Sequence, residues 1–315
     1  MRHTTVTAPR SPMLPFHWLS APIALLAAFA SAAGLLSDMP YAQETAPWAA
    51  QAAAQDTVNL VVYPALLVLA VLAARGSLRA HFAWAGVLAY SAYSYLLYAG
   101  YVHFSPLFLV YVTVLGLSVY ALIGGLALLD PARVREAFDR QAPVRLVARL
   151  LVVFGVLFYA LWLSEVVTAM LAGEAPRAAV ENGLPVNVVH VLDMALLLPA
   201  VITAGVLLGR RRGLGYCLAA PLLTTLGVLT LAIAAMVASL AANGMPVAWG
   251  VVGAMGASGV LSFVALARLL AAVLPQASLL AVLRASPKAP GGDGERGTAG
   301  PVHARRVVTA ASRRR

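Results

Sequence analysis

Residues 105–129 read SPLFLVYVTVLGLSVYALIGGLALL, and residues 130–149 read DPARVREAFDRQAPVRLVAR. The first stretch has no charged side chain, and it exceeds the roughly 20 apolar residues that a helix needs to cross a bilayer. The second stretch carries five arginines. Because basic residues gather in cytoplasmic loops, the two stretches together predict a membrane-spanning helix that ends at the cytoplasmic face.

The same pattern recurs along the whole chain. Hydrophobic residues make up 61% of the sequence and charged residues 11%, which leaves too little polar surface for a water-soluble domain. The predicted spans are residues 16–37, 57–74, 82–100, 105–129, 150–172, 187–209, 213–241 and 247–274. Backbone groups in lipid must be satisfied within each span, so we expect helices. The predicted fold is an all-α polytopic transmembrane bundle of about eight spans.

The basic residues fix an orientation for these spans. With the N-terminus inside, 21 of the 22 Lys and Arg residues lie on the cytoplasmic side and only Arg177 lies outside. Five acidic residues are then expected in the outer loops: Asp38, Glu44, Asp56, Glu174 and Glu181. Both termini are therefore predicted to be cytoplasmic, where the basic loops and tails would meet anionic lipid.

Three regions follow from this arrangement. Residues 1–15 form a cytoplasmic N-tail, residues 16–275 the transmembrane bundle, and residues 276–315 a basic, largely disordered cytoplasmic tail rich in Pro and Gly. Asp130 and Pro131 predict the start of a short interfacial helix that extends to about Gln141. An alternative for the first span is a signal peptide cleaved near Ala30-Ser31-Ala32.

An ionisable residue within a span costs free energy when the helix inserts into the bilayer, so each one suggests a structural or functional role. Glu165 lies in the span 150–172, and His190 and Asp193 lie in the span 187–209. Asn187 shares a helix face with His190 and Asp193, because the three are spaced by three residues. Trp162, Glu165 and Thr168 form a similar face on the other span. These six residues predict an outer-leaflet site that binds or conducts a small ligand, an ion or a proton, as in a transport protein.

Two alternatives remain open for these residues. The cluster forms interhelical hydrogen bonds that only hold the bundle together, as in a structural or accessory protein, or it belongs to an intramembrane enzyme. The enzyme alternative predicts that Tyr95, Tyr98, Tyr101 and His103 line a vestibule that converges on the same pocket. Without such convergence, the tyrosines are an interfacial aromatic belt. No catalytic residue is assigned.

Several other classes of function lack support. Cys217 is the only cysteine, and no second histidine stands at ligand spacing from His190, so we expect no metal site and no cofactor. His190 is also the only histidine predicted to lie well inside a span. The basic charge sits in loops and tails without interleaved aromatics, which argues against nucleic-acid binding. Gly250, Gly253, Gly256 and Gly259 predict close helix packing.

Two stretches carry a resemblance to known proteins. They are YLLYAGYVHFSPLFLVYVTVLGLSVYAL at residues 95–122 and NVVHVLDMALLLPAVITAGVLLGRRRGLG at residues 187–215. Together they resemble a family of uncharacterised bacterial multi-pass integral membrane proteins, with about eight spans and no assigned activity. The resemblance implies a location in the bacterial inner (plasma) membrane, and it implies no mechanism. Protein partners are not indicated.

Overall fold

The computed structural model describes residues 15–247 and 249–284, so the predicted N-tail and most of the predicted basic tail lie outside the described residues. Within these ranges the chain is helical and contains no β-strand. Two isolated bridges join Leu129 to Leu283 and Phe138 to Val273. The all-α prediction is therefore confirmed for the described part of the chain.

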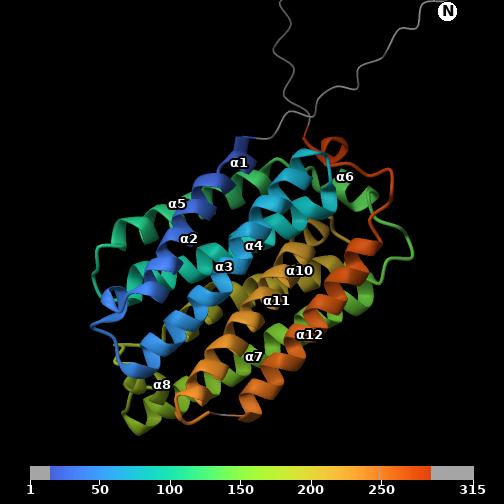
Figure 1. Ribbon diagram of the computed structural model, residues 1–315. Helices are drawn as coiled ribbons and strands as arrows, with labels where there is room; N and C mark the ends of the chain where they lie inside the picture. Colours follow the sequence, from blue (N-terminus) through green and yellow to red (C-terminus); the bar gives the residue numbers. More distant parts are fainter. Residues whose placement is uncertain (1–14, 248, 285–315) are drawn as a thin grey trace, which may run out of the picture. The chain divides into compact units, whose positions relative to one another are not determined.

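The helices pack side by side, most of them along one common direction (Figure 1). Their order is α1 (Pro15–Trp18), α2 (Ser20–Leu36), a 3-10 turn (Met39–Tyr41), α3 (Ala46–Ala74), α4 (Leu78–Tyr101), α5 (Phe108–Ala127), α6 (Pro131–Glu136), α7 (Val144–Ala172), α8 (Arg177–Glu181), α9 (Val188–Leu192), a π-helical turn (Asp193–Leu197), α10 (Leu198–Gly209), α11 (Gly213–Ala242), α12 (Trp249–Ala271) and a 3-10 turn (Leu280–Val282).

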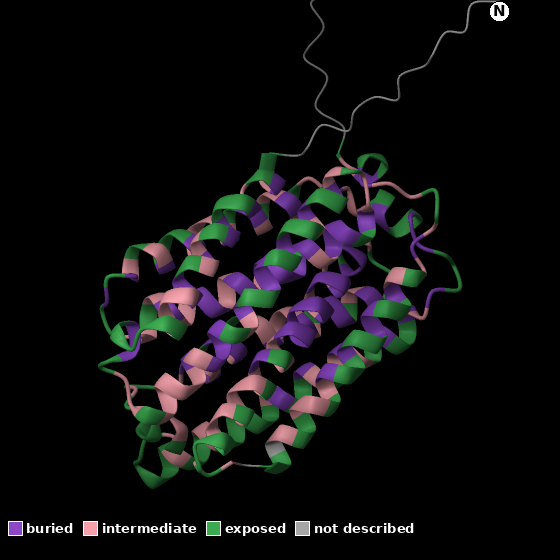
Figure 2. Cartoon of the chain, viewed as in Figure 1, coloured by how far each residue is buried: buried purple, intermediate pink, exposed green. Residues whose placement is uncertain are grey.

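Seven of the described helical segments are long and apolar enough to cross a membrane. They are Pro15–Leu36, Ala46–Ala74, Phe108–Ala127, Val144–Ala172, Val188–Gly209, Gly213–Ala242 and Val252–Ala271. Exposed apolar side chains cover the outside of the bundle and buried residues fill its middle (Figure 2). The chain is therefore built as a multi-pass integral membrane protein.

Helix α4 is long but is not among those seven, because tyrosine, serine and histidine side chains lower its hydropathy. Many of these polar groups point into the protein: His81, Tyr90 and Tyr95 are each at most 1% exposed. Helix α4 packs against α3, α5 and α11. A span can be this polar when neighbouring helices, and not lipid, surround it.

The connections of the bundle separate into two ends. At one end, Leu279 N–H donates to Gly76 O and Asp130 N–H donates to Val282 O. At the other end, the His103 N–H donates to the Glu44 carboxylate, and α8 lies nearby (Figure 1). Twelve of the thirteen described arginines lie at or near the first end: Arg75, Arg79, Arg133, Arg135, Arg140, Arg145, Arg149, Arg210, Arg211, Arg212, Arg268 and Arg284.

Local chemistry explains the short helix α6 at this arginine-rich end. The Asp130 carboxylate accepts hydrogen bonds from the N–H groups of Ala132 and Arg133, as expected of an N-cap. The helix ends at Glu136 and does not reach Gln141. The backbone beyond it pairs instead with the end of α12, where Asp139 N–H donates to Ala272 O.

The structure corrects one expectation about a loop and restricts one about packing. Helix α3 begins at Ala46 and not at residue 57, so Asp56 lies inside the bundle, 2% exposed, and not in an outer loop. In α12, a Cβ on Gly259 would meet the Thr230 side chain at 2.3 Å, which shows close packing. Nothing in the described chain lies near the Cβ positions of the other three glycines in that row, Gly250, Gly253 and Gly256.

Candidate functional site

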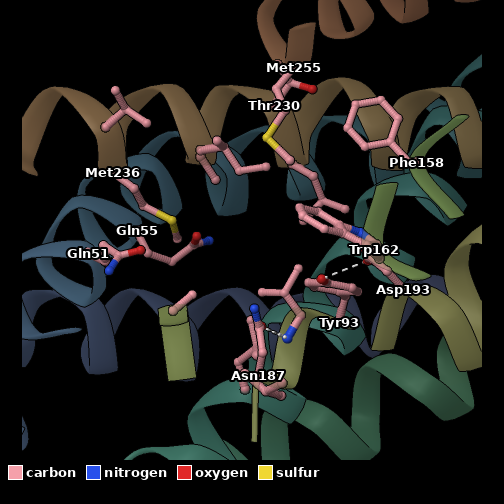
Figure 3. A pocket seen from close by; sticks show the side chains of 18 of the residues that line it. Gln51, Gln55, Tyr93, Phe158, Trp162, Asn187, Asp193, Thr230, Met236 and Met255 are labelled. Carbon is pink, nitrogen blue, oxygen red and sulfur yellow. Dashed lines mark hydrogen bonds between the residues drawn. The ribbon is translucent and has the colours of Figure 1, made fainter. Parts of the chain in front are cut away.

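A cavity of about 440 Å³ lies between the helices toward the α8 end of the bundle. Its lining residues come from α3, α4, α7, α8, α9, the π-helical turn, α10, α11 and α12, and from the segments that connect them. Trp162, Glu165, Asn187 and Asp193 are among them, so four of the six predicted site residues line one cavity. Figure 3 labels Trp162, Asn187 and Asp193. The volume lies within the range of about 300–1,000 Å³ that is usual for small-molecule pockets.

Asp193 is the central polar residue of this pocket. Its Oδ2 accepts a hydrogen bond of 2.8 Å from Trp162 Nε1–H on α7, and its Oδ1 accepts one of 3.0 Å from Tyr93 O–H on α4. Asp193 is 8% exposed. The carboxylate therefore joins three elements of the bundle through two neutral donors.

Glu165 lies one helical turn beyond Trp162. Its Oε2 is 3.4 Å from His190 Nε2, and its side chain is 39% exposed. The side chain of His190 is buried, and its Nδ1 has no hydrogen-bond partner in the described chain. Helix α7 therefore makes two contacts one turn apart: Trp162 with Asp193 of the π-helical turn, and Glu165 with His190 of α9.

The local sequence explains the position of these side chains. Asn187 is the N-cap of α9, and its Oδ1 accepts from the N–H groups of Val189 and His190. After the five residues of α9 the helix widens into a π-helical turn, in which Leu198 N–H donates to Asp193 O. Pro199 follows and has no N–H for a regular helical bond. Such π-turns are frequent at functional sites.

The opposite side of the pocket carries amide groups that the sequence did not single out. Gln51 Nε2 donates to Asn182 Oδ1 at 3.1 Å, which joins α3 to the segment after α8. Gln55 Nε2 donates to the hydroxyls of Tyr90 and Ser94. Gln51 and Gln55 are one turn apart on α3, and both line the pocket (Figure 3).

A second polar cluster, centred on Asp56, lies beside the pocket and was missed. Tyr41 O–H donates to Asp56 Oδ2 at 2.5 Å, and Tyr98 O–H donates to Oδ1 at 3.0 Å. Burial, followed by the Asp56 charge, raises the pKa of Tyr41 well above its usual value, so its hydroxyl remains a donor. The helical spacing of Gln51, Gln55 and Asn59 was the signal that could have shown the buried face of α3.

Several predicted residues lie elsewhere. The Tyr95 ring packs against Tyr98 and Tyr111 on a different face of α4 from Tyr93. Tyr101 is half-buried at the end of α4, and His103 Nδ1 is 3.0 Å from Glu44 Oε1. These residues do not line the pocket. The exposed Thr168 hydroxyl donates to Ser164 O, so the structure does not bring Thr168 to the pocket either.

Two further histidines, His17 and His81, are buried, but each lies within the first four residues of its helix and so not well inside a span. His17 Nε2 donates to His81 Nδ1 at 3.1 Å, because His81 Nε2 must donate to Gly125 O at 3.2 Å. The His17 ring packs edge-on against Trp84. Among the described residues, no three His, Cys, Asp or Glu side chains are grouped as a metal site would require.

No family model, curated protein or solved structure matches this chain. The resemblance to bacterial multi-pass membrane proteins therefore stays a prediction.

Proposed function

We propose that this integral membrane protein binds a small organic molecule in the pocket around Asp193. The observation that carries the proposal is the cavity itself. It combines a mostly apolar lining with a few convergent polar groups, including Asp193, Glu165 and Asn187. Pockets of this composition are the usual binding sites of small molecules.

The alternative of purely structural hydrogen bonds explains part of the site. Both carboxylate oxygens of Asp193 have donors, as that alternative expects. Glu165 argues against it, because its side chain is 39% exposed and its contact with His190 is 3.4 Å long. The enzyme alternative requires the predicted vestibule residues to converge on the pocket, and none of the four lines it: Tyr95, Tyr98, Tyr101 and His103.

Ligand-dependent thermal unfolding tests the proposal, with a cavity-filling variant. Val237 lines the cavity, whereas the next residue, Ala238, is exposed and does not line it. A panel of neutral and charged aromatic amphiphiles is added to the purified wild type and to Val237→Trp and Ala238→Trp. A ligand at about 100 times its Kd stabilises the folded state by about 2.7 kcal/mol.

We expect at least one compound to raise the melting temperature of the wild type and of Ala238→Trp, but not of Val237→Trp. If no compound stabilises the wild type, or if both variants respond alike, the pocket proposal is wrong.

A second candidate function is proton conduction, which the inner face of α4 favours. Ser94 borders the pocket, Ser91 bonds to Tyr63 and Ser118, and His81 bonds to His17 nearer the arginine-rich end. The buried apolar residues Val87 and Leu88 interrupt this series of polar groups.

Proton uptake into proteoliposomes with an imposed potential tests this second candidate. We expect the wild type to take up more protons than empty vesicles do, and His81→Leu to take up fewer than the wild type. Equal uptake in all three preparations would exclude conduction.

The orientation is also a proposal. We place the arginine-rich end in the cytoplasm and count α4 as an eighth span, which leaves both termini on the cytoplasmic side of a bacterial plasma membrane. Support comes from the gathering of twelve described arginines at one end, whereas only Arg177 lies near the other. At the arginine-rich end, Arg145 and Arg149 border a shallow groove where anionic lipid would bind.

A further inference from the structure

We infer that the ligand of the pocket is an organic cation that carries an apolar body. The inference rests on the proposed binding function and names the chemistry of its ligand. Two carboxylates, Asp193 and Glu165, line the cavity, and no lysine or arginine is among its described lining residues. A carboxylate that is removed from water needs a partner that compensates its charge. The described residues that line the cavity include no lysine or arginine that could be this partner.

His190 does not supply the missing positive charge. The orientation of the Asn187 amide is fixed by its N-cap bonds, in which Oδ1 accepts from the backbone. Its Nδ2 therefore faces His190 Nε2, at 3.1 Å, as a donor. Because Nε2 accepts this bond, it carries no proton, and the imidazole is neutral. Glu165 Oε2, at 3.4 Å from the same nitrogen, lacks a cationic partner there.

The partners of Asp193 are neutral as well. An indole N–H can only donate, so Trp162 fixes Oδ2 as an acceptor. Tyr93 donates to Oδ1. These two bonds hold the carboxyl group in place without bringing a positive charge to it. Asp193 and Glu165 are therefore acidic groups at this end of the cavity, and its described lining has no lysine or arginine to pair with either.

The surrounding surface favours an organic ammonium group over a metal ion. Calcium binds six to eight oxygen ligands, whereas both Asp193 oxygens already accept hydrogen bonds from side chains. Aromatic side chains line the same cavity: Trp48, Tyr93, Phe154, Phe158 and Trp162. Ring faces attract tertiary and quaternary ammonium groups through cation–π contacts, which strengthen when the site is shielded from water.

The apolar body of the ligand would lie along α11 and α12. Ile233, Met236 and Leu240 of α11 and Met255 of α12 line that wall. Figure 3 shows Met255 and Thr230 across the cavity from Asn187. Methionine side chains adapt to irregular apolar shapes. This wall should therefore require that the bound part of the ligand is apolar, while it accepts bodies of different shapes.

A pair of probes that differ only in charge tests the inference: 3-phenylpropyltrimethylammonium and its uncharged carbon isostere with a tert-butyl head. Binding of each probe to the purified full-length protein is measured by equilibrium dialysis. The variants are Asp193→Asn and Glu165→Gln, which remove one charge each with little change of shape. Glu174→Gln is the matched control, because Glu174 is exposed at the same end of the bundle and does not line the cavity.

We expect the wild type and Glu174→Gln to bind the cation about tenfold more tightly than the isostere. Each pocket variant should lose most of that preference while it still binds the isostere, which also shows that it is folded. If the wild type binds both probes equally, the ligand is not a cation although the pocket still binds. If the preference survives in both pocket variants, Asp193 and Glu165 do not recognise the cation, and the inference as argued is wrong. If neither probe binds the wild type, this inference fails together with the pocket proposal.

Discussion

Gly34 determines whether the Asp56 cluster can form. A Cβ at this position would lie 2.1 Å from Asp56 Oδ2 and 2.9 Å from the Tyr41 hydroxyl. We therefore expect Gly34→Ala to lower the free energy of unfolding by about 1–3 kcal/mol, as overpacking of a buried site does. Chemical denaturation in detergent measures the change. Gly116→Ala is the control, because nothing lies within 4 Å of its Cβ position. Equal stability of the two variants would show that the cluster tolerates the added methyl group.

The indole N–H of Trp162 is expected to contribute through Asp193. Trp162→Phe retains an aromatic ring but leaves Asp193 Oδ2 without its donor. Loss of one partner from a buried polar group costs about 1–3 kcal/mol, and thermal unfolding should show a loss of this size. Trp18→Phe is the matched control, because Trp18 is 62% exposed. A Trp162→Phe protein as stable as that control would mean that Asp193 finds another donor.

At the scale of single residues, helical spacing predicted one of the two polar clusters described above. Trp162, Glu165, Asn187 and Asp193 meet because their spacing by three residues within two neighbouring spans fixes common faces. The burial of Asp56 was not predicted, because the alanine-rich start of α3 does not have the pattern expected at the beginning of a long span. No spacing rule could show that Tyr98, 42 positions away, donates to it.

At the scale of helices, the π-helical turn before Pro199 sets the direction in which Asp193 points. Without the proline ring, the segment can return to regular helical bonding, which rotates Asp193 relative to the residues that follow. We expect Pro199→Ala to fold with unchanged or higher stability and to bind the cationic probe several-fold more weakly. Dialysis and thermal unfolding of the same sample separate the two effects. Unchanged affinity would show that the turn does not depend on the proline.

The pairing of α11 with α12 depends on one glycine of four. Gly259→Ala would place a methyl group 2.3 Å from the Thr230 side chain, whereas the Cβ position of Gly253 is open. We expect Gly259→Ala to lose about 1–3 kcal/mol of stability and Gly253→Ala to lose none, as measured by denaturation. Equal losses would mean that Gly253 packs against something outside the described residues.

Composition could identify most of the helices but not all of their limits. The run at residues 105–129 appears as Phe108–Ala127, shorter by a few residues. The span predicted at residues 187–209 divides into α9, the π-helical turn and α10, because the bonding pattern before Pro199 depends on tertiary packing. The row of glycines predicted packing along α12, yet which of them meet a neighbour depends on where α11 lies.

For the molecule as a whole, the separation of charge predicts which loops face outward. Arg75 and Phe104 flank α4 at its two ends, and both are exposed. Cys217 is buried, so the native chain should not react with a membrane-impermeant maleimide. On intact cells we expect Phe104→Cys to be labelled, and Arg75→Cys to be labelled only after permeabilisation.

The unsubstituted chain is the control for that experiment. Labelling of both sites from the same side would show that α4 does not cross the membrane, and labelling of Arg75→Cys alone would reverse the orientation.

The segment at residues 276–284 has a consequence for biosynthesis. Its backbone and Arg284 bond to Gly76, Leu128, Leu129 and Asp130, and Leu279 and Val282 fill the core at that end. A ribosome releases this segment only after every described helix has been made. Until translation has passed Arg284, the loops at the arginine-rich end therefore have unpaired backbone groups, and the apolar core at that end is uncovered. A nascent chain that stalls just after α12 would leave this end open to quality-control proteases.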